Sequence, residues 1–381
     1  MANNSEKIIA AKFYFDGGYN FWDIAKGVTI YDVATDDLKK FLDPHWYKFP
    51  AIHPLWYYSF GLVYTVFGII AIFGNITVLR IFSKFKSLRS PANCLIMNLA
   101  IADLCLMLSM MPECIINFFL GGPWIFGKLA CEIHGFSGAL FGYLQMFTLT
   151  VISWDRYNVI VNGVSGNPLT YQKAISLILF GWIYSTAWAV CPFVGWGGYA
   201  VDGILATCSF DYITRSMNNI SHIVSATVVI YFIPLMLIIH WYSKIVLAVV
   251  HHERQLREQA KKMNVQSLRS NQEDGQSAEI RIAKVSVTTV SLWVLAWTPF
   301  AVITNLGLFA DPEVVTPLVT SLPSMLAKTS CAYNPLVYAI SHPRYRECLK
   351  EMYPWICIAA KEKKKNKSDD ESVKTEHTEK A

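Results

Sequence analysis

The stretch VVTPLVTSLPSMLAKTSCAYNPLVYAIS (residues 314–341) is apolar enough to cross a membrane, and its one basic residue is Lys328. A charged side chain at the centre of a membrane helix costs about 3 kcal/mol, so this lysine needs a function that offsets the cost. A buried lysine can lose its proton and attack a carbonyl carbon to form a Schiff base. We therefore expect Lys328 to hold a covalent cofactor that carries an aldehyde.

The rest of the chain has the composition of a protein that crosses the bilayer several times. Of its 381 residues, 53% are hydrophobic and only 16% are charged. Backbone groups in lipid must be satisfied within the spanning segment, so apolar stretches of sufficient length are expected to be helices. This predicts an all-α membrane protein, a bundle of seven transmembrane helices over residues 54–79, 92–119, 133–160, 174–194, 220–250, 285–310 and 314–340.

The charges in the loops predict the orientation of this bundle. Residues 80–89 contain four basic side chains and no acid, whereas residues 121–127 carry no charge. Because basic loops stay in the cytoplasm, the N-terminus is expected outside. Residues 1–53 are then an extracellular tail without a cleaved signal peptide, and its Asn3-Asn4-Ser5 sequon predicts glycosylation of Asn3.

The ends and the cysteines complete the predicted organisation. Residues 54–341 form the membrane domain, residues 342–357 a short amphipathic cytoplasmic helix, and the polar residues 358–381 a disordered cytoplasmic tail. Cys348 and Cys357 are candidate palmitoylation sites. Cys131 and Cys208 lie beside short outer loops, where an oxidising compartment favours a disulfide between them. No metal site is predicted.

Several polar residues within the spans match the rhodopsin-like G-protein-coupled receptors over essentially the whole membrane domain. They are Asn75, Leu99-Ala100 through Asp103, Asp155-Arg156-Tyr157 and Asn334-Pro335-Leu336-Val337-Tyr338. Each alone has a plain structural interpretation as a hydrogen-bonded helix residue. Together, in this order, they are specific to that class of receptor.

Within this class the chain resembles the visual opsins. Lys328 lies six residues before Asn334, the spacing at which opsins carry the retinal-linking lysine, and Trp297-Thr298-Pro299 resembles their sixth-helix aromatic switch. The resemblance is to arthropod rhabdomeric opsins, of crustacean and insect type, through Asp43-Pro44-His45-Trp46-Tyr47, Ala260-Lys261-Lys262-Met263-Asn264-Val265 and Ala339-Ile340-Ser341-His342-Pro343.

The resemblance implies a light-activated receptor that is not an enzyme. Its cofactor would be 11-cis-retinal or a close derivative, bound to Lys328 as a protonated Schiff base. Matching positions also predict the pocket, which comprises His134, Gly138, Gly142, Tyr143, Tyr212, Trp297, Phe300 and Ser324. A non-visual opsin or a retinal photoisomerase on the same fold stays open as an alternative.

A buried Schiff-base cation needs a carboxylate, because desolvation would otherwise remove its proton. Vertebrate pigments place that carboxylate three residues after the third-helix cysteine, but this chain has His134 there. Asp202, six residues before Cys208, is the leading candidate, in a loop that the disulfide would hold as a lid. Glu113 is the alternative and could pair with His134; joint action or a water network also stays open.

The resemblance assigns further residues to the switch and to coupling. In darkness Arg156 would be held by Asp155, next to Tyr157, and by Glu279. Tyr242 and Tyr338 would stabilise the active state, with Asn334 and Pro335 in the same motif. The implied partners are a Gq-type heterotrimeric G protein acting on phospholipase C, arrestin and a receptor kinase, with no nucleic acid. The implied location is the plasma membrane of photoreceptor cells, in the rhabdomere microvilli.

Overall fold

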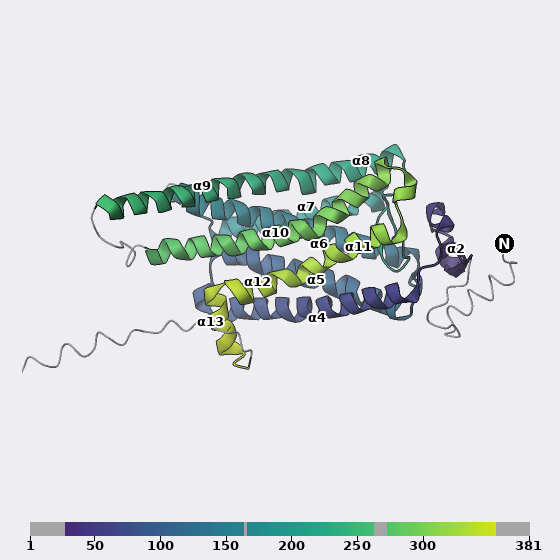
Figure 1. Ribbon diagram of the computed structural model, residues 1–381, viewed down its shortest axis with the longest axis horizontal. Coiled ribbons are helices and arrows are strands. Elements are labelled where there is room, and N and C mark those ends of the chain that lie inside the picture. Colours follow the sequence, from purple (N-terminus) through teal and green to yellow (C-terminus); the bar gives the residue numbers. More distant parts are fainter. Residues whose placement is uncertain (1–26, 164–165, 263–272, 356–381) are drawn as a thin grey trace, which may run out of the picture.

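The helices lie alongside one another as a single elongated bundle (Figure 1). The computed structural model describes residues 27–163, 166–262 and 273–355. Its long helices are α4 (Pro54–Lys84), α5 (Pro91–Phe119), α6 (Gly127–Tyr157), α7 (Tyr171–Val190), α9 (Ile233–Lys262) and α10 (Glu273–Phe309). α8 (Met217–Ala226) and the π turn η6 (Thr227–Phe232) lead directly into α9. Short turns of helix occur at η2 (Lys86–Leu88), η3 (Asn158–Asn162), η5 (Cys191–Val194) and η7 (Pro312–Val314).

Six helical stretches in the described part of the chain are long and apolar enough to cross a membrane. The predicted seventh crossing is divided into α11 (Pro317–Thr329), η8 (Ser330–Ala332) and α12 (Tyr333–Ser341). This crossing is therefore not among the six long helical stretches, although it runs through the bundle beside α4, α5 and α10. Seven crossings result, which confirms the predicted all-α fold. α9 and α10 extend beyond the apolar stretches that predicted them.

A proline explains the division of the seventh crossing. Pro335 has no backbone N–H, so the carbonyl of Cys331, four residues earlier, loses its helical donor. Asn75 of α4 supplies the missing hydrogen bond, with its Nδ2 donating to the Cys331 carbonyl at 3.0 Å and to Ala71 at 2.9 Å. The buried Asn75 thus ties the first crossing to the break in the seventh.

A folded cap covers one end of the bundle. It contains α2 (Ile30–Val33), α3 (Asp36–Lys39) and η1 (Pro44–Lys48), together with a hairpin of β1 (Tyr199–Val201) and β2 (Cys208–Phe210). Trp46 is buried among hairpin residues, and Lys48 forms an ion pair with Glu313 at 2.6 Å. The predicted N-terminal tail is therefore folded from about residue 28, while Asn3 lies outside the described residues.

At the opposite end, α13 (Pro343–Met352) turns away from the bundle axis (Figure 1). The predicted helix was longer, but Pro354 disfavours helical backbone at Tyr353, and the helix ends before it. Tyr345 packs against Phe82 with ring centroids 5.9 Å apart. The Cys348 thiol is buried and burial raises its pKa, which makes it a weak nucleophile. Cys357 and residues 358–381 lie outside the described residues.

Candidate functional site

A cavity lies between the helices and is closed on one side by β2. Most of its walls are apolar or aromatic, and Lys328 of α11 lies in its lining. Seven of the residues predicted to surround the cofactor line this cavity: Gly138, Gly142, Tyr143, Trp297, Phe300, Ser324 and Lys328. Further lining residues that the sequence did not single out include Leu106, Met110, Phe210, Ile230, Tyr231 and Thr304.

The shape of the cavity depends on one close approach between α6 and α10. A Cβ atom added to Gly142 would lie 2.6 Å from Cη2 of Trp297, so only glycine leaves room for the indole. Trp297 stacks on Trp293 with centroids 5.2 Å apart, and its Nε1 donates to Ser330 Oγ at 3.0 Å. A largely apolar and aromatic cavity with a lysine in its wall fits a conjugated hydrocarbon that carries an aldehyde.

Lys328 is only 7% exposed and reaches an acid through one hydroxyl group. Its Nζ donates to Ser324 Oγ at 3.1 Å, and Ser324 Oγ donates to Asp202 Oδ2 at 3.3 Å. The ring of Tyr64 lies 5.9 Å from Nζ. Nζ is the atom that an aldehyde would modify covalently. The Ser324 hydroxyl lies between this atom and the Asp202 carboxylate.

Asp202 is 1% exposed and accepts hydrogen bonds from four hydroxyl groups. Besides Ser324 they come from Thr207 at 2.8 Å, Ser209 at 2.6 Å and Tyr212 at 3.0 Å. Burial raises the pKa of Tyr212 well above its usual range, so its hydroxyl remains a donor. Several donors stabilise the ionised form of a carboxylate.

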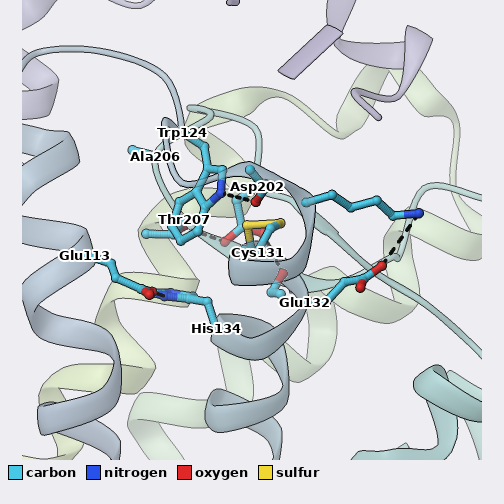
Figure 2. Close-up of a disulfide and its surroundings, with 12 residues drawn as sticks. Glu113, Trp124, Cys131, Glu132, His134, Asp202, Ala206 and Thr207 are labelled. Carbon is cyan, nitrogen blue, oxygen red and sulfur yellow. Dashed lines mark hydrogen bonds and ion pairs between the residues drawn. A yellow bond between two sulfur atoms is a disulfide. The ribbon is translucent and has the colours of Figure 1, made fainter. Parts of the chain in front are cut away.

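The hairpin turn fixes Asp202 in this position. Its backbone N–H donates to Thr207 O, and its carbonyl accepts from Leu205 N, both at 2.8 Å. The disulfide between Cys131 and Cys208 joins β2 to the start of α6, next to these groups (Figure 2). The predicted disulfide is thus present, and the loop lies over the cavity as a lid.

The second candidate acid, Glu113, is paired with a histidine. His134 Nδ1 lies 2.7 Å from Glu113 Oε2, and Figure 2 shows this pair bridging α5 and α6 beneath the disulfide. The His134 side chain is fully buried, whereas that of Glu113 is 27% exposed. Four of the predicted residues lie outside the lining of the cavity and do not form part of its wall: Glu113, His134, Asp202 and Tyr212.

The residues predicted for the switch lie at the other end of the bundle. Arg156 pairs with the adjacent Asp155, and both are buried. Tyr242 is buried close to Arg156, and Tyr338 packs against Tyr345 with centroids 6.1 Å apart.

Other members of the predicted set are connected through the middle of the bundle or fall at its edge. Asn334 Nδ2 donates to Asp103 Oδ2 at 2.8 Å, which joins the seventh crossing to the second. Pro335 follows at the break already described, and Tyr157 ends α6. Glu279 belongs to α10, but its side chain lies outside the described residues.

The sequence interpretation missed the hydroxyl groups that surround Asp202. Thr207 and Ser209 flank Cys208 in the chain, and alternation along a strand places residues i and i+2 on one face. That pattern could have indicated two donors directed to the same place. Ser324 was expected only in the pocket wall. Its i, i+4 spacing from Lys328 on one helix could have indicated their contact, whereas no local pattern indicates the contact with Asp202.

Comparison with known proteins identifies the family. Residues 74–338 match the family model described as 7 transmembrane receptor (rhodopsin family). The chain is 44% identical to compound eye opsin BCRH1 of Hemigrapsus sanguineus over 350 residues, covering 92% of this chain and 93% of that opsin. It is 42% identical to the lateral eye opsin of Limulus polyphemus, covering 94% and 96% of the two chains.

A solved structure agrees with this assignment. The crystal structure of squid rhodopsin superposes with a TM-score of 0.76 at 38% identity, covering 84% of this chain and 92% of that one. These relatives are visual opsins, which are membrane receptors rather than enzymes, carry a retinal chromophore and act through a G protein. The chain therefore belongs to the rhodopsin family of seven-transmembrane receptors and, within it, to the opsins of arthropod eyes.

Proposed function

We propose that this opsin is a visual pigment in which 11-cis-retinal, or a close derivative, is attached to Lys328. The observation that carries the proposal is the buried Lys328 amine in the wall of an aromatic cavity, one hydroxyl group away from a buried acid. When bound, retinal supplies an aldehyde for a Schiff-base linkage and a polyene that absorbs light. The remaining tasks belong to the side chains of the protein.

Asp202 and Ser324 hold the proton on the lysine nitrogen in this proposal. Asp202 provides the negative charge. Ser324 connects it to the lysine, because the serine hydroxyl accepts a hydrogen bond from Nζ and donates one to Oδ2. The other hydroxyl donors, Thr207 and Ser209 among them, hold the Asp202 carboxylate in place. The lysine nitrogen then keeps its proton in a site from which the lid excludes bulk water.

Trp297 is the proposed link between the cavity and the inner end of the bundle. Its indole is held between Gly142 and Ser330, so a change in the shape of the cavity contents must displace it. Pro299, two residues further along α10, interrupts the hydrogen bonds of that helix and allows it to bend. We infer that this bend moves the inner half of α10 and releases Arg156 from Asp155.

The proposed cascade is that of a rhabdomeric photoreceptor. The protein would activate a Gq-type G protein and phospholipase C, and would be switched off by a receptor kinase and arrestin. It would reside in rhabdomere microvilli with its N-terminus outside. The basic first loop and the similarity to compound eye opsins support this assignment.

Reconstitution tests the proposal directly. The protein is expressed in cultured cells, supplied with 11-cis-retinal, and its absorption is recorded in darkness and after illumination. We expect a visible band that light alters, and no such band in the Lys328→Ala variant. Light-dependent release of inositol phosphates, compared with cyclic AMP, tests Gq coupling. A visible band with isomerised retinal but no G-protein activation would favour a photoisomerase instead.

A further inference from the structure

His134 lies beside the lid, in contact with Glu113 and close to Lys328 and Asp202. His134 projects from α6 with its Nδ1 on Glu113 Oε2 at 2.7 Å, while its Nε2 faces the Cys114 thiol at 3.9 Å. The edge of Trp124 packs against the imidazole with ring centroids 5.3 Å apart. These contacts fix both nitrogens, so the histidine cannot turn away from Glu113 without leaving buried polar atoms unpaired.

His134 lies among the ionisable groups near Lys328, whose formal charges can be counted. Lys328, Asp202 and Glu113 all interact electrostatically with His134, and Tyr64 and Cys114 are the neutral titratable groups beside them. One lysine and two carboxylates have formal charges that sum to −1. A proton shared across the 2.7 Å contact between His134 and Glu113 would bring this sum to zero, and charges removed from solvent need such pairing.

We propose that His134 neutralises Glu113 and thereby leaves Asp202, acting through Ser324, as the sole counterion of the lysine nitrogen. His134 is a positioning residue in this scheme, since it contacts neither Lys328 nor the cavity. The inference rests on the proposed function and goes beyond it, because it states why one of two nearby acids is used.

The two acids differ in the way this scheme requires. Asp202 has four hydroxyl donors and reaches Lys328 through Ser324, and within the described part of the chain no cation forms an ion pair with it. Glu113 has an imidazole nitrogen, Nδ1 of His134, as a direct partner at 2.7 Å, and its side chain is 27% exposed. Removal of the imidazole would leave the Glu113 carboxylate without its partner and within the electrostatic reach of Lys328.

A titration of the reconstituted pigment tests the proposal. The measured quantity is the pH at which half of the visible band is lost as the lysine nitrogen deprotonates. Asp202→Asn should lower this midpoint by about 2 pH units, since a unit charge about 6 Å away is removed. Adding His134→Phe, which keeps an aromatic ring against Trp124, should raise the midpoint again by 1 unit or more as Glu113 takes over. Adding Glu113→Gln to that pair should abolish the recovery.

Two outcomes would overturn the inference. One is that the double variant Asp202→Asn/His134→Phe has the same titration midpoint of the visible band as Asp202→Asn alone. The other is a loss of the visible band in Glu113→Gln while Asp202→Asn keeps it, which would make Glu113 the counterion. In both cases a visible band that depends on Lys328 leaves the proposed function intact, whereas absence of that band in the unmodified protein removes the proposed function.

A measurement on the protein without retinal keeps the inference testable if pigment yields are low. Melting temperatures are compared for Glu113→Gln, His134→Phe and the double variant in detergent. A pair that shares a proton predicts that the double variant loses less than the two single losses combined. Additive losses would show that His134 serves packing alone and would overturn the pairing.

Discussion

Replacement of Ser324 by alanine is the sharpest test of how the acid reaches the lysine. The Ser324 hydroxyl is the group that contacts both Lys328 Nζ and Asp202 Oδ2, at 3.1 and 3.3 Å. The alanine variant removes the connection and leaves both charged groups in place. We expect the lysine nitrogen of the pigment to hold its proton less tightly, so that the visible band is lost at a lower pH.

The size of the effect follows from the two hydrogen bonds. A hydrogen bond to a charged group contributes about 1.5–3 kcal/mol, which corresponds to a downward shift of about 1–2 pH units in the titration midpoint. The same bonds limit the distance from Nζ to Oδ2 to about 6.4 Å, at which the direct attraction in an effective dielectric of 20 is about 2.6 kcal/mol. Asp202→Asn should therefore lower the midpoint by about 2 units.

The assay is a spectral pH titration of purified pigment in darkness, with Ser321→Ala as the matched control. Ser321 lies three residues from Ser324 on α11 and is also buried, but its Oγ accepts from Ile204 N in the lid. If Ser324 and Asp202 act in series, the double variant should titrate close to Asp202→Asn. An unchanged midpoint in Ser324→Ala, or strictly additive shifts in the double variant, would refute the relay.

Three further predictions concern the cavity, the lid and the inner end. Gly142→Val should reduce pigment yield about tenfold, because its side chain would collide with Trp297, and yield is measured from the visible band after reconstitution. Cys131→Ser should destabilise the protein by roughly 4 kcal/mol, since the disulfide with Cys208 closes a loop of 77 residues, and denaturation of the protein without retinal measures this. Burial lowers the pKa of His342, which caps α13, so below about pH 6.5 the unfolded chain binds more protons than the folded one. The melting temperature should therefore fall as the pH drops below 6.5, and His342→Asn should remove that dependence.

Local sequence was sufficient for the parts of this protein that depend on composition and spacing. The apolar stretches predicted seven crossings, because a helix must cover about 30 Å of hydrocarbon whatever its neighbours are. The isolated Lys328 indicated a special site, since an unpaired charge in an apolar span is costly. Cys131 and Cys208 were expected to pair, and they do.

Boundaries and breaks were harder to predict, because they depend on partners from other helices. The seventh crossing was expected as one helix, yet it is divided at Ser330–Ala332 where Asn75 of α4 replaces a helical hydrogen bond. The N-terminal segment was expected as a tail, but burial of Trp46 against the hairpin folds its second half. Hydropathy averaged along the chain contains neither of these contacts.

A lysine, a loop that could act as a lid and two candidate acids are recognisable in the amino-acid sequence, but their spacing does not show which acid serves the lysine. Tertiary structure decided the arrangement: Asp202 and Ser324 are 122 residues apart but hydrogen-bonded, and Glu113 and His134 are 21 apart and paired. Hydrogen bonds act over about 3 Å, and helix packing and the fold of the lid set which distant side chains come that close. Spacing along the chain identifies the groups, and only their separation in space determines which of them share a proton.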